Sequence, residues 1–264
     1  MRGDYGWSLI AFWEESDRKT VYSRGHRTAH LFEVALGIEG GSNSIDSNVR
    51  VGERSSLAPM ITYLLPGMGA DGRMYPAAWE ALPNVVRVEW PVCRGECTLD
   101  EIAKRIVGEY NITDGAIVVG SSLGGMVACE IAKMREPERL VLVGSAIHKE
   151  EVNTLLRLMS PLIDLAPITF IQRLAGKVPA ELTQMFERSE PAFIRAMCRA
   201  IFSWQGLAAA KVKPLRIHGR RDRVIPPPAE VDYLIDGGHL IAMTHAEECV
   251  AHLGAALGYE RAGH

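Results

Sequence analysis

The chain has 264 residues, of which 47% are hydrophobic and 23% are charged, which is ordinary for a globular protein. The net charge is -3 and the basic residues are scattered, which argues against the basic face of a nucleic-acid-binding domain. No apolar run approaches the roughly 18 residues of a membrane span, and the N-terminus lacks the pattern of a signal peptide. We therefore expect a cytoplasmic protein of one large domain, with or without an extension, and no nucleic-acid or membrane partner.

The cysteines are odd in number and lack paired C-x-x-C spacing, which disfavours both a disulfide framework and structural zinc. They stand at positions 93, 97, 129, 198 and 249. We expect reduced and mostly buried thiols, and no metal or organic cofactor.

The first 59 residues differ in character from the rest of the chain. They contain the glycine- and serine-rich run 40–44 and show no clear alternation of strands and helices. Two interpretations stay open, an extension that packs on the domain or a poorly ordered segment.

From residue 60 onward, short apolar strands alternate with amphipathic helices. The expected strands cover residues 61–65, 85–90, 116–119, 140–143, 215–218 and 233–235. The expected helices cover residues 76–82, 99–110, 123–135 and 244–257. This alternation is typical of βαβ units and predicts an α/β fold with a mostly parallel central sheet flanked by helices.

The alternation is interrupted between residues 149 and 213, where a mostly helical stretch is rich in leucine and isoleucine. Ligands bind at the carboxyl edge of open α/β sheets, so an insertion over that edge would form a helical lid. The predicted organisation is an N-terminal extension (1–59), a core (60–148 and 214–264) and a helical lid insertion (149–213).

The segment Gly120–Gly124 reads G-S-S-L-G and fits the pattern G-x-S-x-G. It follows the strand expected at 116–119 and opens the helix expected at 123–135. A tight strand–turn–helix connection exposes the serine hydroxyl at a helix N-terminus, where backbone N–H groups favour developing negative charge. Ser122 is therefore the candidate nucleophile.

A serine hydroxyl needs a base to remove its proton, and the base needs a carboxylate to hold it. Asp222 follows the strand expected at 215–218, in the segment H-G-R-R-D-R-V-I-P. His239 follows the strand expected at 233–235, in the segment G-G-H-L. The chain order serine, acid, histidine predicts Asp222 as the acid and His239 as the base.

These three motifs, in this order and at these distances, resemble the α/β-hydrolase superfamily and its serine esterases and lipases. The resemblance covers about residues 60–258. It implies an eight-stranded type of sheet core, a helical lid, and hydrolysis of esters or related bonds. Residues 1–59 match no part of that pattern, and Pro66 stands where the family often has histidine.

Such hydrolysis needs two N–H donors that stabilise an oxyanion. One is expected at the backbone of Leu123, the residue after the nucleophile, and the other in the loop that follows the first core strand. That loop is Pro66–Gly69, and we assign the second donor to the Met68 N–H.

Rival residues remain at the level of sequence. His218 is a second histidine close to the acid, interpreted as a packing or loop-orienting residue. Asp236 is a second acid, but it lies only three residues from His239. Asp222 has arginines on both sides, so a salt bridge is its alternative role.

The run Gly67–Gly72 also fits the dinucleotide pattern G-x-G-x-x-G, with Glu89 about 20 residues further on. Proline is tolerated only in the first turn of a helix. The helix therefore begins near Pro76, which leaves Gly72 in a loop and argues against the pattern. An NAD(P)-dependent oxidoreductase remains an alternative.

The expected function is hydrolysis of carboxylic esters with small or medium apolar acyl chains, through an acyl-enzyme, and the expected partner is a small-molecule ester. The apolar preference comes from the leucine- and isoleucine-rich insertion, which is expected to line the site. The other hypotheses are a slow-turnover or non-catalytic ligand receptor on this fold, and a lyase or acyltransferase that uses the same serine.

Overall fold

The computed structural model describes residues 60–153, 179–207 and 212–258. The two interpretations of residues 1–59 lie outside the described residues, and so does most of the leucine- and isoleucine-rich part of the insertion (154–178). Among the helices of the described part, none is both long and apolar enough to cross a membrane.

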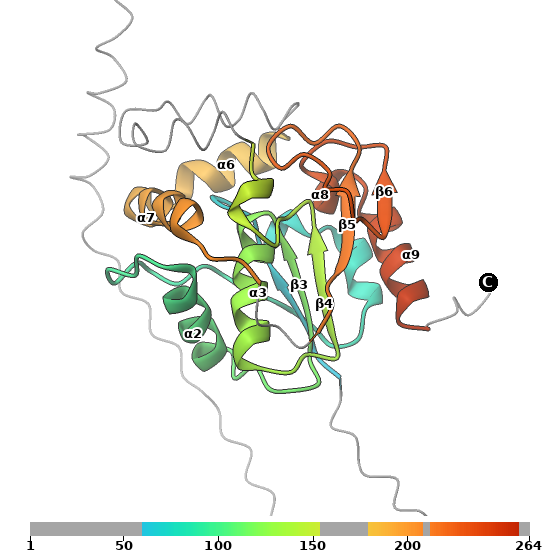
Figure 1. The fold of residues 1–264 in the computed structure, drawn as a ribbon, viewed down its shortest axis with the longest axis horizontal. Helices are drawn as coiled ribbons and strands as arrows, with labels where there is room; N and C mark the ends of the chain where they lie inside the picture. Colours follow the sequence, from blue (N-terminus) through green and yellow to red (C-terminus); the bar gives the residue numbers. More distant parts are fainter. Residues whose placement is uncertain (1–59, 154–178, 208–211, 259–264) are drawn as a thin grey trace, which may run out of the picture. The chain divides into compact units, whose positions relative to one another are not determined.

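A six-stranded sheet, with every strand parallel to its neighbours, forms the centre of the described chain (Figure 1). In spatial order the strands are β2 (Val85–Arg87), β1 (Thr62–Leu65), β3 (Ile117–Ser121), β4 (Arg139–Val143), β5 (Leu215–Gly219) and β6 (Tyr233–Ile235). The predicted α/β fold with a parallel central sheet is confirmed. The eight-stranded sheet implied by the resemblance is represented by six strands in the described residues.

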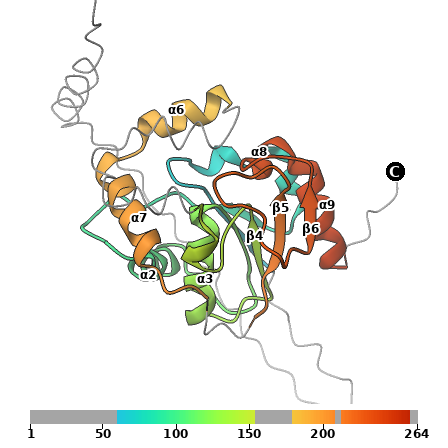
Figure 2. The same cartoon turned by 45° about the horizontal axis from the view of Figure 1, so that its top comes forward.

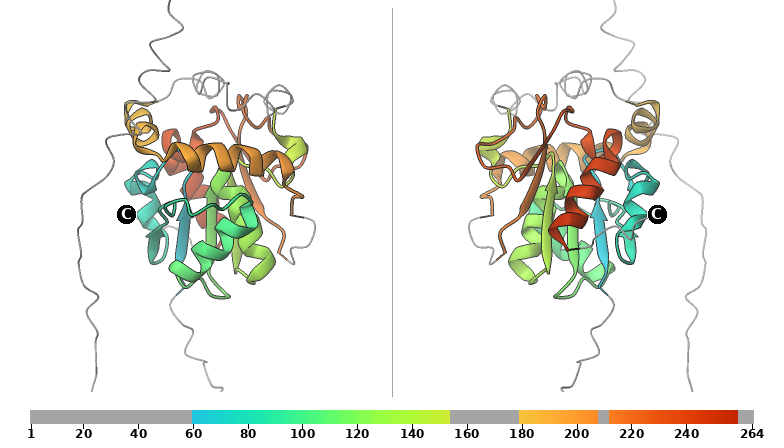
Figure 3. Two further views of the ribbon diagram at one scale, coloured as in Figure 1. Left: turned by 90° about the vertical axis from the view of Figure 1, so that its left-hand side faces the viewer. Right: turned by 90° about the vertical axis from the view of Figure 1, so that its right-hand side faces the viewer.

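Helices cover both faces of this sheet (Figure 3). The α-helices are α2 (Leu99–Glu109), α3 (Leu123–Met134), α6 (Ala180–Arg188), α7 (Pro191–Ser203), α8 (Ile241–Thr244) and α9 (Ala246–Ala256). The apolar side chains of α2, α3 and α7 belong to one buried cluster, and those of α8 and α9 belong to a second. The sheet is therefore the middle layer of three.

The strands divide their side chains between the two clusters with a period of two residues. In β3 and β4, Val118 and Leu140 join the cluster that contains α2 and α3, whereas Val119 and Val141 join the cluster that contains α9. All four side chains are fully buried. Burial on both faces explains why these strands are continuous apolar runs in the sequence.

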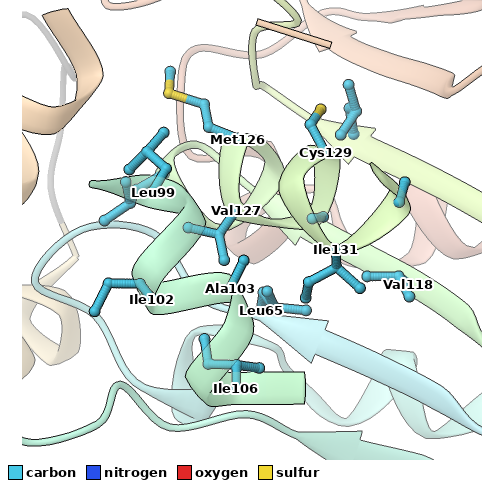
Figure 4. Close-up of a cluster of buried hydrophobic side chains, with 14 of the residues drawn as sticks. Leu65, Leu99, Ile102, Ala103, Ile106, Val118, Met126, Val127, Cys129 and Ile131 are labelled. Atoms are coloured by element: carbon cyan, nitrogen blue, oxygen red, sulfur yellow. The ribbon is translucent and has the colours of Figure 1, made fainter. Parts of the chain in front are cut away.

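The helix α2 shows how local and tertiary signals agree. Its N-cap Thr98 accepts a hydrogen bond from the Glu101 N–H, and the Glu101 carboxylate accepts one from the Thr98 N–H, which together form a capping box. Leu99, Ile102 and Ile106 of α2 then lie in the same buried cluster as Met126, Val127 and Ile131 of α3 (Figure 4). Each such fully buried side chain contributes about 1.5–3 kcal/mol of hydrophobic stabilisation.

Three predicted elements differ in extent or type. The helix expected at 76–82 is a short 3-10 helix, η2 (Ala77–Ala81). It begins after Pro76, whose backbone is extended. The helix expected at 244–257 corresponds to α9, which begins at Ala246; His245, whose φ of -135° is not helical, separates it from α8, a short helix that was not expected. The strand expected at 85–90 ends at Arg87, where its pairing with β1 ends.

Two helices of the predicted insertion, α6 and α7, belong to the described chain, as does the short 3-10 helix η3 (Lys149–Glu151). In Figures 1 and 2, α6 lies beyond the carboxyl ends of the strands, and α7 runs beside α2 and α3. Phe186 of α6 packs against Gly69, in the loop after β1. The helical content of the insertion is therefore as predicted in the described part, and its role as a lid stays a prediction.

Candidate active site

Ser122 lies in the sharp turn between β3 and α3, as the sequence predicted. Its backbone angles are φ 52° and ψ -120°, a conformation that non-glycine residues rarely adopt and that stores strain. The turn brings Gly124 against the end of β1, so closely that a Cβ there would lie 2.3 Å from the Leu65 carbonyl oxygen. Glycine is therefore required two residues after the serine, which is the physical basis of this half of the motif.

The structure brings the three predicted residues Ser122, Asp222 and His239 together at the carboxyl edge of the sheet. The His239 Nε2 atom lies 2.9 Å from Ser122 Oγ, and the His239 Nδ1 atom lies 2.8 Å from Asp222 Oδ2. Asp222 and His239 are buried, and Ser122 is half-buried. Asp222 follows β5 and His239 follows β6, so the parallel order of the strands places both loops beside the turn after β3.

The Asp222 carboxylate has its remaining acceptor sites filled by its own loop. Its Oδ1 atom accepts hydrogen bonds from the Val224 N–H and the Ile225 N–H, both 2.9 Å long. Burial alone raises the pKa of this carboxyl, but the charge of His239 and the donated hydrogen bonds outweigh it and hold the pKa well below its ordinary value. Asp222 is therefore ionised at neutral pH and orients the imidazole.

His218, interpreted from the sequence as a packing or loop-orienting residue, lies next to the acid. Its Nε2 atom is 2.7 Å from the Ile225 carbonyl oxygen and 3.4 Å from Asp222 Oδ2. Because a carbonyl oxygen only accepts, Nε2 carries the proton and donates it toward both oxygens. This fully buried histidine fixes the loop of the acid and adds a donor to its carboxylate.

Among the contacts of the described residues, the second acid Asp236 does not contact His239, and Asp222 does not form the salt bridge with a neighbouring arginine that was its alternative role. Arg221 pairs with Asp236 at 2.9 Å on the surface, where both side chains are more than half exposed. The partners of the Asp222 carboxylate are the two amides and two imidazoles described above.

The two predicted oxyanion donors both lie beside Ser122. Leu123 is the first residue of α3, where the first N–H groups of a helix have no acceptor within it. Met68 lies in a tight turn in which the Ala70 N–H donates to the Gly67 carbonyl at 3.1 Å. Gly69, at φ 72°, provides the positive φ that the third position of such a turn requires.

This turn lies directly against the serine, since a Cβ at Gly67 would be 3.6 Å from Ser122 Cβ. Sequence reasoning missed the side chains that hold it. The Gly67 N–H donates to Met74 Sδ at 3.0 Å, and the Gly67 carbonyl accepts from Trp90 Nε1 at 3.0 Å. Nothing in the local sequence pattern marks Met74 or Trp90, because both reach the turn only through the folded chain.

Ser145 is a further residue that was missed. Its hydroxyl donates to the Ser122 carbonyl at 2.6 Å and so supports the turn from the side of β4. The available signal was its position, two residues past a strand expected to end at the same edge of the sheet.

A cavity of about 280 Å³ lies beside the turn, between the loop after β2 and the helices α6 and α7. Its wall combines apolar and charged side chains, among them Trp90, Met185, Phe193, Glu89 and Arg188. Two side chains of the insertion, Met185 and Phe193, line this cavity, whereas Ser122, Asp222 and His239 are not among its lining residues. The prediction that residues 154–178 line the site lies outside the described residues.

The connection from β1 to β2 does not have the form of a dinucleotide site. Residues 66–84 are all described, and they contain the 3-10 helices η1 (Gly72–Met74) and η2 but no α-helix whose N-terminus would hold a pyrophosphate. Gly72 lies in η1 rather than in a loop, and its N–H donates to the Glu89 carboxylate at 3.1 Å. Within the described ranges, no group of three or more His, Cys, Asp or Glu residues is placed to hold a metal ion.

Several solved structures share this fold at low sequence identity. The match with a thermophilic esterase from Thermogutta terrifontis has a TM-score of 0.60 and 18% sequence identity, and it covers 75% of this chain and 89% of the esterase chain. The match with an esterase from Exiguobacterium antarcticum has a TM-score of 0.58 and 16% identity, and it covers 75% of this chain and 92% of the esterase chain. The match with the enol-lactonase from Burkholderia xenovorans LB400 has a TM-score of 0.57 and 20% identity, and it covers 78% of this chain and 94% of the lactonase chain. The comparison with curated proteins finds no match. Residues 55–252 match the sequence model of the alpha/beta hydrolase family, and the chain belongs to that family.

Proposed function

We propose that the protein is a serine hydrolase that cleaves carboxylic esters with small or medium apolar acyl chains. The observation that carries the proposal is the contact of His239 with Ser122 Oγ on one side and with the Asp222 carboxylate on the other. A base that is held by a carboxylate and contacts the hydroxyl is what nucleophilic catalysis by serine requires, and Ser122 also stands at the N-terminus of α3.

In the first half of the reaction, Ser122 Oγ attacks the acyl carbon and its proton passes to His239 Nε2. The Asp222 carboxylate accepts the hydrogen bond from Nδ1–H and stabilises the imidazolium that forms. The tetrahedral intermediate collapses when Nε2 returns the proton to the departing alkoxide, which leaves as the alcohol. An acyl group is then bound to Ser122 through an ester.

In the second half, water takes the place of the alcohol. His239 Nε2 accepts a proton from the water as its oxygen attacks the acyl carbon, and it then returns this proton to Ser122 Oγ. The acid is released and the serine is restored. In both halves the negative oxygen is stabilised by the N–H groups of Leu123 and Met68, which flank the serine.

The choice of an apolar ester rests on the surroundings of the site. Trp90, Met185 and Phe193 form the apolar part of the wall of the neighbouring cavity, to which the acyl or alcohol part of a small ester can bind. The similar solved structures include two esterases and an enol-lactonase, which hydrolyse esters or cyclic esters by name. We extend that chemistry to this chain as part of the proposal.

The test is a series of p-nitrophenyl esters with acyl chains from acetyl to decanoyl, assayed with wild type, Ser122→Ala and Ser203→Ala. Ser203, an exposed serine at the end of α7, is the matched control. We expect the Ser122→Ala variant to lose about 10³-fold or more in kcat/KM, while Ser203→Ala keeps the wild-type value. Binding of esters without turnover by the wild type would instead favour a receptor.

A further inference from the structure

The peptide between Gly67 and Met68 is held by its carbonyl oxygen. The Gly67 oxygen accepts two hydrogen bonds, one of 3.0 Å from Trp90 Nε1 and one of 3.1 Å from the Ala70 N–H. The Ala70 bond belongs to the turn itself, whereas the Trp90 bond comes from the loop after β2. A side chain 23 residues away therefore supplies half of the donors on this oxygen.

The position of that oxygen determines the direction of the Met68 N–H. A peptide unit is planar, and this one is trans, so the carbonyl of Gly67 and the N–H of Met68 point in opposite directions. While the oxygen is bound to Trp90, the Met68 N–H faces away from the indole. Rotating the peptide by half a turn would break both hydrogen bonds on the oxygen and aim the N–H at Trp90.

The indole packs against a neighbour on the insertion. Its ring lies against Phe193 of α7, with ring centroids 5.3 Å apart and the planes tilted by 39°. Pro66, the residue before the turn, has neither an N–H nor a polar side chain with which to orient the loop. The indole N–H of Trp90 is thus a side-chain donor, packed against α7, to the carbonyl of the residue that follows Pro66.

We propose that Trp90 is a positioning residue for the oxyanion donor at Met68, and the proposal rests on the serine hydrolase function above. Trp90 does not touch the reacting atoms. It keeps the Gly67–Met68 peptide in the orientation that leaves the Met68 N–H free for the oxyanion. Because the oxyanion exists only in the transition state and the intermediates, losing this hold lowers kcat and leaves KM nearly unchanged.

The first test replaces the indole by a ring without a donor, Trp90→Phe. Removal of a whole oxyanion donor costs about 10²–10³-fold in kcat, and loosening one costs less, so we expect kcat to fall about 10-fold with KM within about twofold. An alkyl trifluoromethyl ketone provides a second readout. Ser122 Oγ adds to its carbonyl carbon, the proton passes to His239, and the carbonyl oxygen becomes an oxyanion. Its inhibition constant should rise by the same factor.

The control is Trp204→Phe. Trp204 lies at the end of α7, and its indole N–H donates a hydrogen bond to the Glu130 carboxylate of α3, so the variant also removes an indole donor. It should leave kcat and the inhibition constant at the wild-type values. If Trp90→Phe proves too unstable to assay, β-(3-benzothienyl)alanine at position 90 keeps the bicyclic shape and replaces only the N–H by sulfur. The same 10-fold loss is then expected.

Two results would overturn the proposal on its own. One is an unchanged kcat and inhibition constant in a folded Trp90 variant. The other is a rise in KM alone, which would mean that Trp90 only lines the cavity. Full activity of Ser122→Ala would instead remove the proposed function and this inference with it, so the two failures are distinguishable.

Discussion

His239 Nε2 lies 2.9 Å from Ser122 Oγ, although 117 residues of chain separate them. The parallel sheet accounts for this proximity, because the loops that leave the carboxyl ends of β3 and β6 open on the same edge. The loop of Asp222 lies between them in the strand order. A small set of strand ends therefore assembles the candidate site.

The acid is tested by Asp222→Asn. An amide in place of the carboxylate donates toward Nδ1 and favours the wrong imidazole tautomer, so we expect kcat to fall by about 10³–10⁴-fold while the fold is retained. Asp236→Asn is the matched control, because Asp236 is exposed and pairs with Arg221 on the surface. Equal kinetics for the two variants would contradict the role given to Asp222.

The depressed pKa of Asp222 also predicts how stability changes with pH. A carboxyl group whose pKa is lowered by folding stabilises the folded state at pH values above its pKa in the unfolded chain, which is about 3.9. This stabilisation is lost as the pH falls toward the lower pKa of the group in the folded chain. The difference in unfolding free energy between wild type and Asp222→Asn should therefore be largest above pH about 5 and shrink toward pH 2. Urea denaturation at several pH values measures it, and a difference independent of pH would refute the shift.

The tight turn at the serine is tested by Gly124→Ala. The added Cβ would meet the carbonyl oxygens of Leu65 and Pro66 at 2.3 and 2.4 Å, and backbone atoms do not move aside easily. We expect a loss of about 3 kcal/mol in unfolding free energy. Gly108→Ala is the control, since nothing lies within 4 Å of a Cβ there and the residue is in α2. Urea denaturation should show that this variant gains about 0.5–1 kcal/mol, and equal effects would argue against the close approach.

The cysteines provide a test that is independent of activity. Burial raises the pKa of the Cys198 thiol to about 11 and that of Cys249 to about 12, and it raises that of Cys129 further. Cys93 and Cys97 are more accessible. A thiol reagent should therefore modify two thiols of the native chain rapidly and all five after denaturation. Rapid modification of all five in the native state would contradict the packing described here.

The features that sequence reasoning anticipated carry local signals. Ser122, Asp222 and His239 each follow a short apolar strand and lie in a turn rich in glycine or charged residues, so their place at the sheet edge follows from the alternation of elements. The helix expected at 99–110 likewise follows from its apolar spacing, and the structure has it at Leu99–Glu109. Such features need no knowledge of distant contacts.

The features that escaped prediction depend on the assembled fold. Trp90 and Ser145 act through hydrogen bonds to backbone carbonyls 23 residues away, and each partner becomes a neighbour only when the strands pair. The 3-10 form of η2 is a second example. Its few residues show too little periodicity to separate it from an α-helix, and the extended conformation of Pro76 decides where it starts.

The most direct measurement is covalent labelling of the intact chain with an alkyl fluorophosphonate, followed by peptide mass spectrometry. The account predicts one phosphonyl group per chain, on the peptide that contains Ser122, formed as Ser122 Oγ displaces fluoride, and no label on Ser122→Ala. Label on another residue, or no label on a wild type that still hydrolyses esters, would contradict the assignment of Ser122 as the nucleophile.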